Sequence, residues 1–195
     1  MTGLYIHVPF CVKKCHYCDF VIASAGDGAK HAGFLDALEK EAAHQAPAFW
    51  NVSFETLYIG GGTPSALRSE ELRRLFDTVR KCFSFKQDAE ITCEANPGDI
   101  DEEKASLLKA LGVRRISLGA QSFHDRTLDS LNRDHDAAQI SRAFALLRQA
   151  GFSDINLDLM LSLPGESEED VLDSLAQALA LAPEHVSIYE LTGEK

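Results

Sequence analysis

Residues 3–20 read GLYIHVPFCVKKCHYCDF, where a short apolar stretch over residues 4–9 runs directly into Cys11, Cys15 and Cys18. This is the pattern of a β-strand whose end delivers a loop rich in potential ligands. The run ends on Phe20, without a fourth cysteine at the same crowded spacing. In a chain without an export signal, such a cysteine cluster indicates metal or redox chemistry rather than disulfides.

The rest of the chain alternates short apolar strands with amphipathic helices. After the first strand, we expect strands over residues 56–60, 90–95, 115–120, 155–163 and 186–191. The helices expected between them cover residues 34–45, 69–83, 102–111, a segment with apolar residues at 140, 143, 144 and 147, and a segment that begins after Ser167. Alternation at this spacing predicts an α/β fold with a parallel sheet and crossover helices.

The residues at the ends of the predicted strands indicate whether the sheet is open or forms a barrel. Every strand end carries polar or ligand-type groups, namely the cysteine loop, the glycines at 60–62, Glu94, Gln121, Asp158 and Thr192. A barrel directs all strand ends to a common centre, whereas an open sheet spreads them along a line. The strands are too few to close a complete TIM barrel. We therefore expect a partial (βα)6 TIM-like barrel, one domain over residues 1–195 that ends at the sixth strand.

The composition is that of a globular protein, with 45% hydrophobic and 25% charged residues among 195. No apolar run is long enough for a membrane span, and the first residues lack the basic region of a signal peptide. The net charge of −11 disfavours nucleic acid as a partner, because phosphate contacts need a basic surface. We expect a cytoplasmic protein.

The three clustered thiols fit two kinds of metal site. Thiolates hold iron–sulfur clusters, and three of them would leave one iron of a four-iron cluster open to a small molecule. The alternative is a zinc-stabilised interaction module, with His16 as a fourth ligand. Its place next to Cys15 is awkward for ligating the same ion. Cys82 and Cys93 lie far from the cluster, and buried structural thiols are the favoured interpretation for both.

Other polar residues support a ligand site less specifically. The spacing of Gly60, Gly62 and Ser65 is similar to that of the G-x-G-x-x-G/A dinucleotide-binding motif. Pro64 within the loop and a serine at the third position argue against a dinucleotide site. The glycines still permit close approach of backbone to a ligand. Asp158 lies within an apolar strand, where a carboxylate must be paired or bind something.

The motifs YIHVPFC, YIGGGTPS, EANPGD, SLGAQSF, NLDLM and HVSIYELT occur in this order along the chain. Together they resemble the radical S-adenosylmethionine (radical SAM) superfamily, and within it the oxygen-independent coproporphyrinogen III oxidase-like branch. The resemblance implies a four-iron, four-sulfur cluster on Cys11, Cys15 and Cys18, with S-adenosylmethionine chelating the open iron. Reduction of the cluster by an electron donor such as a flavodoxin or ferredoxin would allow cleavage of S-adenosylmethionine to methionine and a 5′-deoxyadenosyl radical.

The resemblance also implies which residues contact S-adenosylmethionine. The matching positions are Tyr5, Gly61, Gly62, Thr63, Glu94, Gln121, Arg133 and Asp158. Tyr17 in the cysteine loop and Thr192 near a further contact complete the expected set. Carboxylates suit ribose hydroxyls and the surroundings of a sulfonium, and a guanidinium suits a carboxylate.

Departures from the branch pattern narrow the expected function. The true oxidases have a further cysteine where this chain has Phe20, and they have an extension ahead of the first strand. In both features the chain resembles the haem chaperone group, whose members bind haem and deliver it to other proteins. The alternative is oxidative decarboxylation of coproporphyrinogen III to protoporphyrinogen IX, so enzymatic turnover stays open.

Ser162 replaces a usual glycine, and relatives continue beyond Lys195 into a C-terminal domain. We therefore expect a truncated form whose last strand exposes its apolar face.

Overall fold

In the computed structural model, which describes residues 2–24, 26 and 28–191, a single parallel sheet carries the fold. Its strands are ordered β1-β4-β5-β6-β7-β8. Their bounds are Gly3–Val8 (β1), Ser53–Gly61 (β4), Ser84–Ala95 (β5), Arg115–Gln121 (β6), Asp154–Leu161 (β7) and His185–Glu190 (β8). The helices are Gly28–Gln45 (α1), Ser69–Cys82 (α2), Glu102–Ala110 (α3), Asp125–Ser130 (α4), Ala137–Gln149 (α5) and Glu168–Ala180 (α6).

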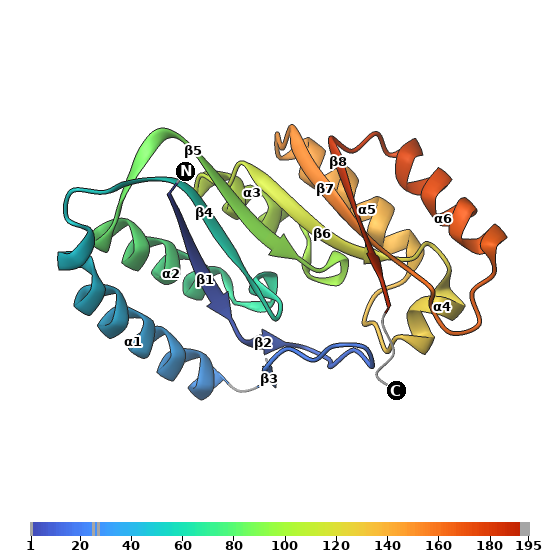
Figure 1. The fold of residues 1–195 in the computed structure, drawn as a ribbon, viewed down its shortest axis with the longest axis horizontal. Helices are drawn as coiled ribbons and strands as arrows, with labels where there is room; N and C mark the ends of the chain where they lie inside the picture. The colour runs from blue at the N-terminus through green and yellow to red at the C-terminus, as the bar shows by residue number, and fades with distance from the viewer. Residues whose placement is uncertain (1, 25, 27, 192–195) are drawn as a thin grey trace.

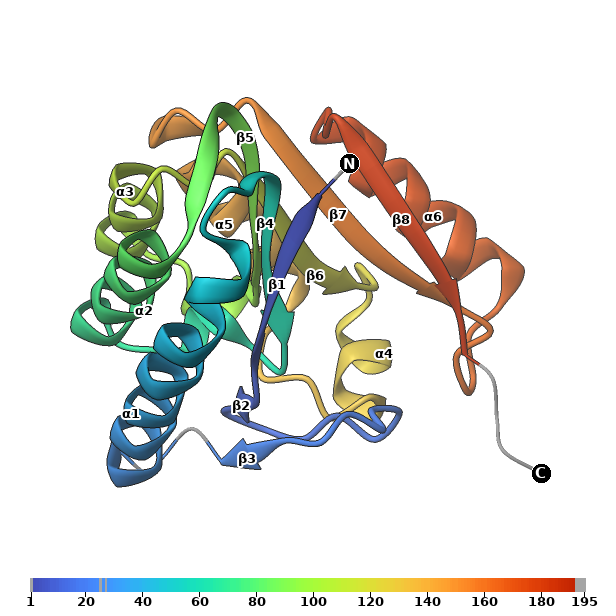
Figure 2. The same ribbon diagram turned by 60° about the vertical axis from the view of Figure 1, so that its left-hand side comes forward.

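The strand order makes the sheet a partial barrel. Each new strand pairs with the preceding strand of this sheet, so the sheet grows in one direction from β1 to β8. Right-handed crossovers then place the connecting helices on one face, whereas a doubly wound sheet has them on both. Helices α1, α2, α3, α5 and α6 lie on the convex side, with β1 and β8 as the two edges (Figure 1 and Figure 2). The predicted partial barrel is confirmed.

Alternation along each strand separates a core from a polar interior. On β6, Ile116 and Leu118 are fully buried against the helices, while Ser117 and Gly119 face the concave side. On β7 the same alternation directs Asp158 inward. The apolar layer between sheet and helices stabilises the fold, and the concave layer is free to carry chemistry.

Several boundaries differ from the expectations. Helix α1 begins six residues before the predicted residue 34, and β5 begins at Ser84 rather than residue 90. Helix α4 and the two-residue strands Phe10–Cys11 (β2) and Ala23–Ser24 (β3) were not predicted, because segments this short carry too little periodicity. On β8, Ile188 is 49% exposed.

Ser162, at the position where the resemblance implies a glycine, adopts a backbone φ of 62°. This left-handed conformation costs a residue with a Cβ roughly 1 kcal/mol, whereas glycine adopts it freely. The serine therefore adopts this conformation of the turn after β7 at a small cost in stability.

The triglycine turn, residues 60–62 at the end of β4, holds the start of the cysteine loop. The Gly62 N–H donates to Val8 O at 2.8 Å, and the Thr63 N–H donates to Phe10 O at 2.6 Å. A Cβ on Gly62 would lie 2.6 Å from Phe10 O and 2.9 Å from Phe10 N. Gly61 has φ +113°, and a Cβ there would lie 2.6 Å from the Nδ1 of His7. The close approach that these glycines permit is thus to other parts of the same chain.

We expect Gly62→Ala to lower the free energy of unfolding by about 1–3 kcal/mol, because the new methyl group meets backbone that cannot move aside. The control is Gly33→Ala on the exposed face of α1, where an added Cβ meets nothing within 4 Å. That change should stabilise the protein by about 0.5–1 kcal/mol, since glycine weakens a helix interior. Urea unfolding measures both, and equal effects would contradict the packing argument.

Candidate functional site

A cavity of about 390 Å³ opens at the carboxyl ends of the strands, within the size range of small-molecule sites. Its wall combines the cysteine loop with the concave faces of the sheet. The predicted site residues that line it are Cys11, Cys15, Tyr17, Cys18, Gly61, Gly62, Thr63, Glu94, Gln121, Arg133 and Asp158. The fold thus brings together residues that span almost 150 positions of the sequence, from 11 to 158.

Two predicted residues are not part of this wall. Tyr5 lies on β1, is 54% exposed, and places its hydroxyl 3.0 Å from the Nδ1 of His7. Its ring packs near that of Tyr58 at a centroid distance of 6.1 Å, and it does not line the cavity. Thr192 lies outside the described residues.

The cysteine loop is tied to the segment that follows α4. The His16 N–H donates to Leu131 O at 3.1 Å, and its Nδ1 donates to Ser130 O at 2.9 Å. The Asn132 side chain donates to Lys14 O at 2.7 Å. These contacts orient the loop so that its three thiols line the cavity.

The thiols do not form the compact set that one zinc ion needs. Among the described residues, no three His, Cys, Asp or Glu side chains converge closely enough to hold a single ion. A tetrahedral zinc with Zn–S bonds of about 2.3 Å brings its sulfurs to about 3.8 Å from one another. An iron–sulfur cluster instead takes each thiolate on a different iron, which suits thiols that are spread over a cavity wall. The imidazole of His16 is directed to Ser130 O and not to the thiols.

Burial sets the ionisation of the thiol nearest to the triglycine turn. The Thr63 hydroxyl donates to the Cys11 Sγ at 3.4 Å. Burial raises the pKa of Cys11, and the Thr63 hydrogen bond offsets only part of that shift. A bound cation is therefore the natural partner for the Cys11 thiolate.

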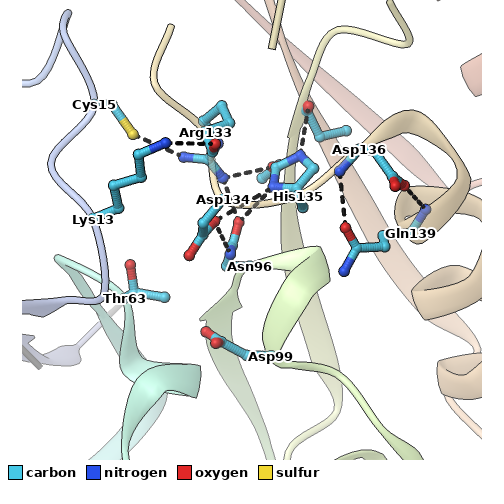
Figure 3. A network of polar contacts seen from close by, with 12 residues as sticks. Lys13, Cys15, Thr63, Asn96, Asp99, Arg133, Asp134, His135, Asp136 and Gln139 are labelled. Atoms are coloured by element: carbon cyan, nitrogen blue, oxygen red, sulfur yellow. Dashed lines mark hydrogen bonds and ion pairs between the residues drawn. The ribbon is translucent and has the colours of Figure 1, made fainter. Parts of the chain in front are cut away.

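Arg133 joins the cysteine loop to the barrel (Figure 3). Its Nη1 donates to Cys15 Sγ at 3.3 Å and to Tyr17 Oη at 3.4 Å. Its Nη2 donates to Gly119 O at 3.0 Å and to Asn96 Oδ1 at 2.5 Å. Its Nε is buried and has no partner among the described residues. A buried guanidinium donor without a partner in a polar cavity fits a site that takes an anionic group.

Glu94 forms the wall between β4 and β6. Its Oε1 accepts from the Tyr58 hydroxyl at 2.7 Å, and its Oε2 accepts from the Gly61 N–H at 3.0 Å. Burial raises the pKa of Glu94, and these two hydrogen bonds oppose the shift without cancelling it.

Asp158 forms the opposite wall on β7. It accepts from the Ser117 hydroxyl and from the Asn156 amide, both at 2.8 Å. Burial raises the pKa of Asp158 as well. Two carboxylates therefore face the cavity from different strands, where they are suited to hydroxyl or cationic groups of a ligand.

Sequence reasoning missed the residues that hold the charged groups in place. Asn96 and Asn156 contact Arg133 and Asp158 respectively, and Ser117 contacts Asp158. Ser117 and Asn156 alternate with buried apolar residues along their strands, which was the available indication. Asn96 follows β5, and nothing in the sequence placed it beside Arg133.

A family model for the radical SAM superfamily matches residues 5–178. The chain is 38% identical over 98% of its length to the heme chaperone HemW of Haemophilus influenzae, and 40% identical over 98% to HemW of Escherichia coli. It is 36% identical over 96% of its length to the oxygen-independent coproporphyrinogen III oxidase of Escherichia coli. These alignments cover 51%, 51% and 41% of the relatives, so the chain spans about half of their length.

Solved structures show the same fold. Coproporphyrinogen III oxidase from Escherichia coli superposes with a TM-score of 0.92 at 34% identity, over 98% of this chain and 44% of that one. Methylornithine synthase shares the fold with a TM-score of 0.68 at 12% identity, over 100% of this chain and 55% of that one.

The raised pKa of Glu94 predicts a pH-dependent stability. The folded protein binds more protons than the unfolded chain above pH of about 4, so the stability of wild type relative to Glu94→Gln should fall as the pH rises. Glu71 gives the opposite case, because hydrogen bonds from Arg68 and His31 outweigh burial and lower its pKa to about 2. Wild type relative to Glu71→Gln should therefore lose stability as the pH falls below about 4. Denaturant unfolding across this range tests both signs, and equal slopes would contradict the assignment.

Proposed function

The chain belongs to the radical SAM superfamily, and on this premise we propose that it binds a four-iron, four-sulfur cluster through Cys11, Cys15 and Cys18 together with S-adenosylmethionine. The single observation that carries the proposal is the cavity, which brings three thiols, the carboxylates of Glu94 and Asp158 and the guanidinium of Arg133 together at the barrel's carboxyl end. Soft thiolates are the ligands that iron–sulfur clusters require. Three of them leave one iron for a small molecule.

The residues around the thiols have roles consistent with holding S-adenosylmethionine. Arg133 is permanently cationic and would bind a carboxylate, while Glu94 and Asp158 would accept from hydroxyl groups or face a sulfonium. Tyr17, Gln121 and the turn at Gly61, Gly62 and Thr63 complete the predicted contacts, to which Tyr5 and Thr192 also belong. When bound, the cluster would supply one electron to the sulfonium. The chain's own part is to orient the ligand and exclude water.

Haem binding and delivery is the function that we favour for the whole protein. Relatives named heme chaperone HemW are 34–40% identical to this chain and the oxidase relative is 36% identical, so identity does not separate the two functions. Phe20 is the more specific observation. It lines the cavity, is 62% exposed and contributes no thiol. Coproporphyrinogen III oxidation is the second candidate, favoured by the TM-score of 0.92 with the oxidase structure.

The proposed partners and compartment follow from the same chemistry. Haem would pass to haem-receiving proteins, and a flavodoxin or ferredoxin would supply electrons. The five cysteines are all free, which suits a reducing compartment such as the cytoplasm. None of the helices in the described part of the chain is long and apolar enough to cross a bilayer.

Cys15→Ala should abolish cluster uptake, because the cavity then offers only two thiols. The matched control is Cys82→Ala at the end of α2, which should bind iron and sulfide as wild type does. Anaerobic reconstitution followed by iron and sulfide analysis and by absorption spectroscopy measures the effect, and circular dichroism checks the fold. Unchanged charge-transfer bands in Cys15→Ala would refute the ligand assignment. Wild type that holds one zinc and no iron would instead support the zinc module.

Reconstituted protein separates the two haem-related functions. We expect a Soret band on titration with haem and no product from coproporphyrinogen III under anaerobic conditions with a reductant and S-adenosylmethionine. Formation of protoporphyrinogen IX would contradict the carrier function. Failure to bind haem in an otherwise loaded protein would remove haem delivery from the proposal without affecting the cluster.

A further inference from the structure

One buried amide contacts three consecutive side chains of the segment that crosses the cavity. Asn96 lies just after β5 and is 5% exposed. The segment is Arg133, Asp134 and His135, between α4 and α5. We propose that Asn96 is a positioning residue, which holds the guanidinium of Arg133 on the Cys15 thiolate and thereby tunes the reduction potential of the bound cluster.

The hydrogen bonds fix both the place and the orientation of the amide (Figure 3). Asn96 Oδ1 accepts from Arg133 Nη2 at 2.5 Å and from His135 Nδ1 at 2.9 Å. Asn96 Nδ2 donates to Asp134 Oδ1 at 2.6 Å. Arginine has only donors, and a carboxylate that approaches an amide nitrogen accepts from it. The amide therefore cannot turn over without losing its contacts with both Arg133 and Asp134.

The two ends of this arrangement are themselves anchored. The Asn96 N–H donates to the Ser65 hydroxyl at 2.9 Å, and that hydroxyl donates to Asp99 Oδ2 at 2.7 Å. His135 is buried, and its Nε2 lies 3.3 Å from Ala120 O at the end of β6. Asn96 and His135 thus connect the segment to two neighbouring strands of the barrel.

The guanidinium depends on this amide for its position. Apart from Asn96, its Nη2 has only the carbonyl of Gly119 as a partner, and its Nε has none among the described residues. Nη1 is thereby directed to Cys15 Sγ and Tyr17 Oη. An N–H donor on a cluster thiolate stabilises the reduced state, whose negative charge is larger, and so raises the reduction potential. Loss of the amide should release the guanidinium and lower the potential.

The inference rests on the proposed cluster, so its test has one measurement with the cluster and one without. Asn96→Leu removes all three hydrogen bonds, keeps the branching of the side chain and leaves the net charge unchanged. The control is Asn51→Leu at an exposed residue before β4. In reconstituted protein, an EPR-monitored redox titration should give a more negative midpoint potential for Asn96→Leu only. In apo protein, the backbone amide of His16 should exchange about tenfold faster, as expected for the loss of a charge-assisted hydrogen bond that holds the loop.

A charge-exchange pair tests the same contact if Asn96→Leu does not fold. In Asn96→Asp, a second carboxylate faces Asp134, and repulsion should separate them. In the double variant Asn96→Asp, Asp134→Asn, the new amide donates to the new carboxylate, and the net charge is that of wild type. The double variant should recover the wild-type exchange rate of the His16 amide. Its midpoint potential should be higher than the value expected from adding the shifts of the two single variants.

The outcomes separate this inference from the proposed function. A folded Asn96→Leu with the potential and the exchange of wild type would overturn it, and so would strictly additive effects in the charge-exchange pair. If wild type takes up no cluster, the proposed function fails. The exchange of the apo proteins then still decides whether Asn96 holds the segment.

Discussion

The cavity depends on the guanidinium of Arg133, because its hydrogen bonds connect the cysteine loop to the barrel. The loop between β2 and β3 has little regular structure, and it cannot fix the thiols of Cys15 and Cys18 by itself. Arg133 donates to Cys15 and Tyr17 on one side and to Asn96 and Gly119 on the other. Burying such a cation is unfavourable unless its donors find acceptors. The polar layer of the barrel is arranged to supply them.

That polar layer is possible because the apolar layer is complete without it. Residues such as Ile116, Leu118 and Leu157 are fully buried between the sheet and the helices. The alternate positions are therefore free to carry Ser117, Asn156 and Asp158. Glu94, Asp158 and Arg133 each contact a neutral polar side chain, namely Tyr58, Ser117 and Asn96 respectively. The first two pairs come from adjacent strands, and the third joins the segment after β5 to the segment between α4 and α5. The same parallel sheet that stabilises the fold thus also aligns the site.

The sequence was most informative where a residue's role follows from its place on a strand. Periodicity and alternation were enough to predict the strands, the partial barrel and the gathering of Cys11, Glu94, Gln121 and Asp158 at one end. The resemblance added Arg133, whose sequence context would otherwise suggest a surface charge. Contacts between distant segments could not be predicted, since nothing local relates Asn96 to residues 133–135. Gly62 illustrates the same limit, because its neighbour is the backbone of Phe10 rather than a ligand.

We propose above all that this cavity holds a cluster with one iron open to S-adenosylmethionine. The most direct measurement is the EPR spectrum of the anaerobically reconstituted and reduced protein, recorded with and without S-adenosylmethionine. We expect a changed spectrum that saturates with added ligand, because coordination alters the open iron. A four-iron cluster whose spectrum is the same with and without S-adenosylmethionine would contradict it.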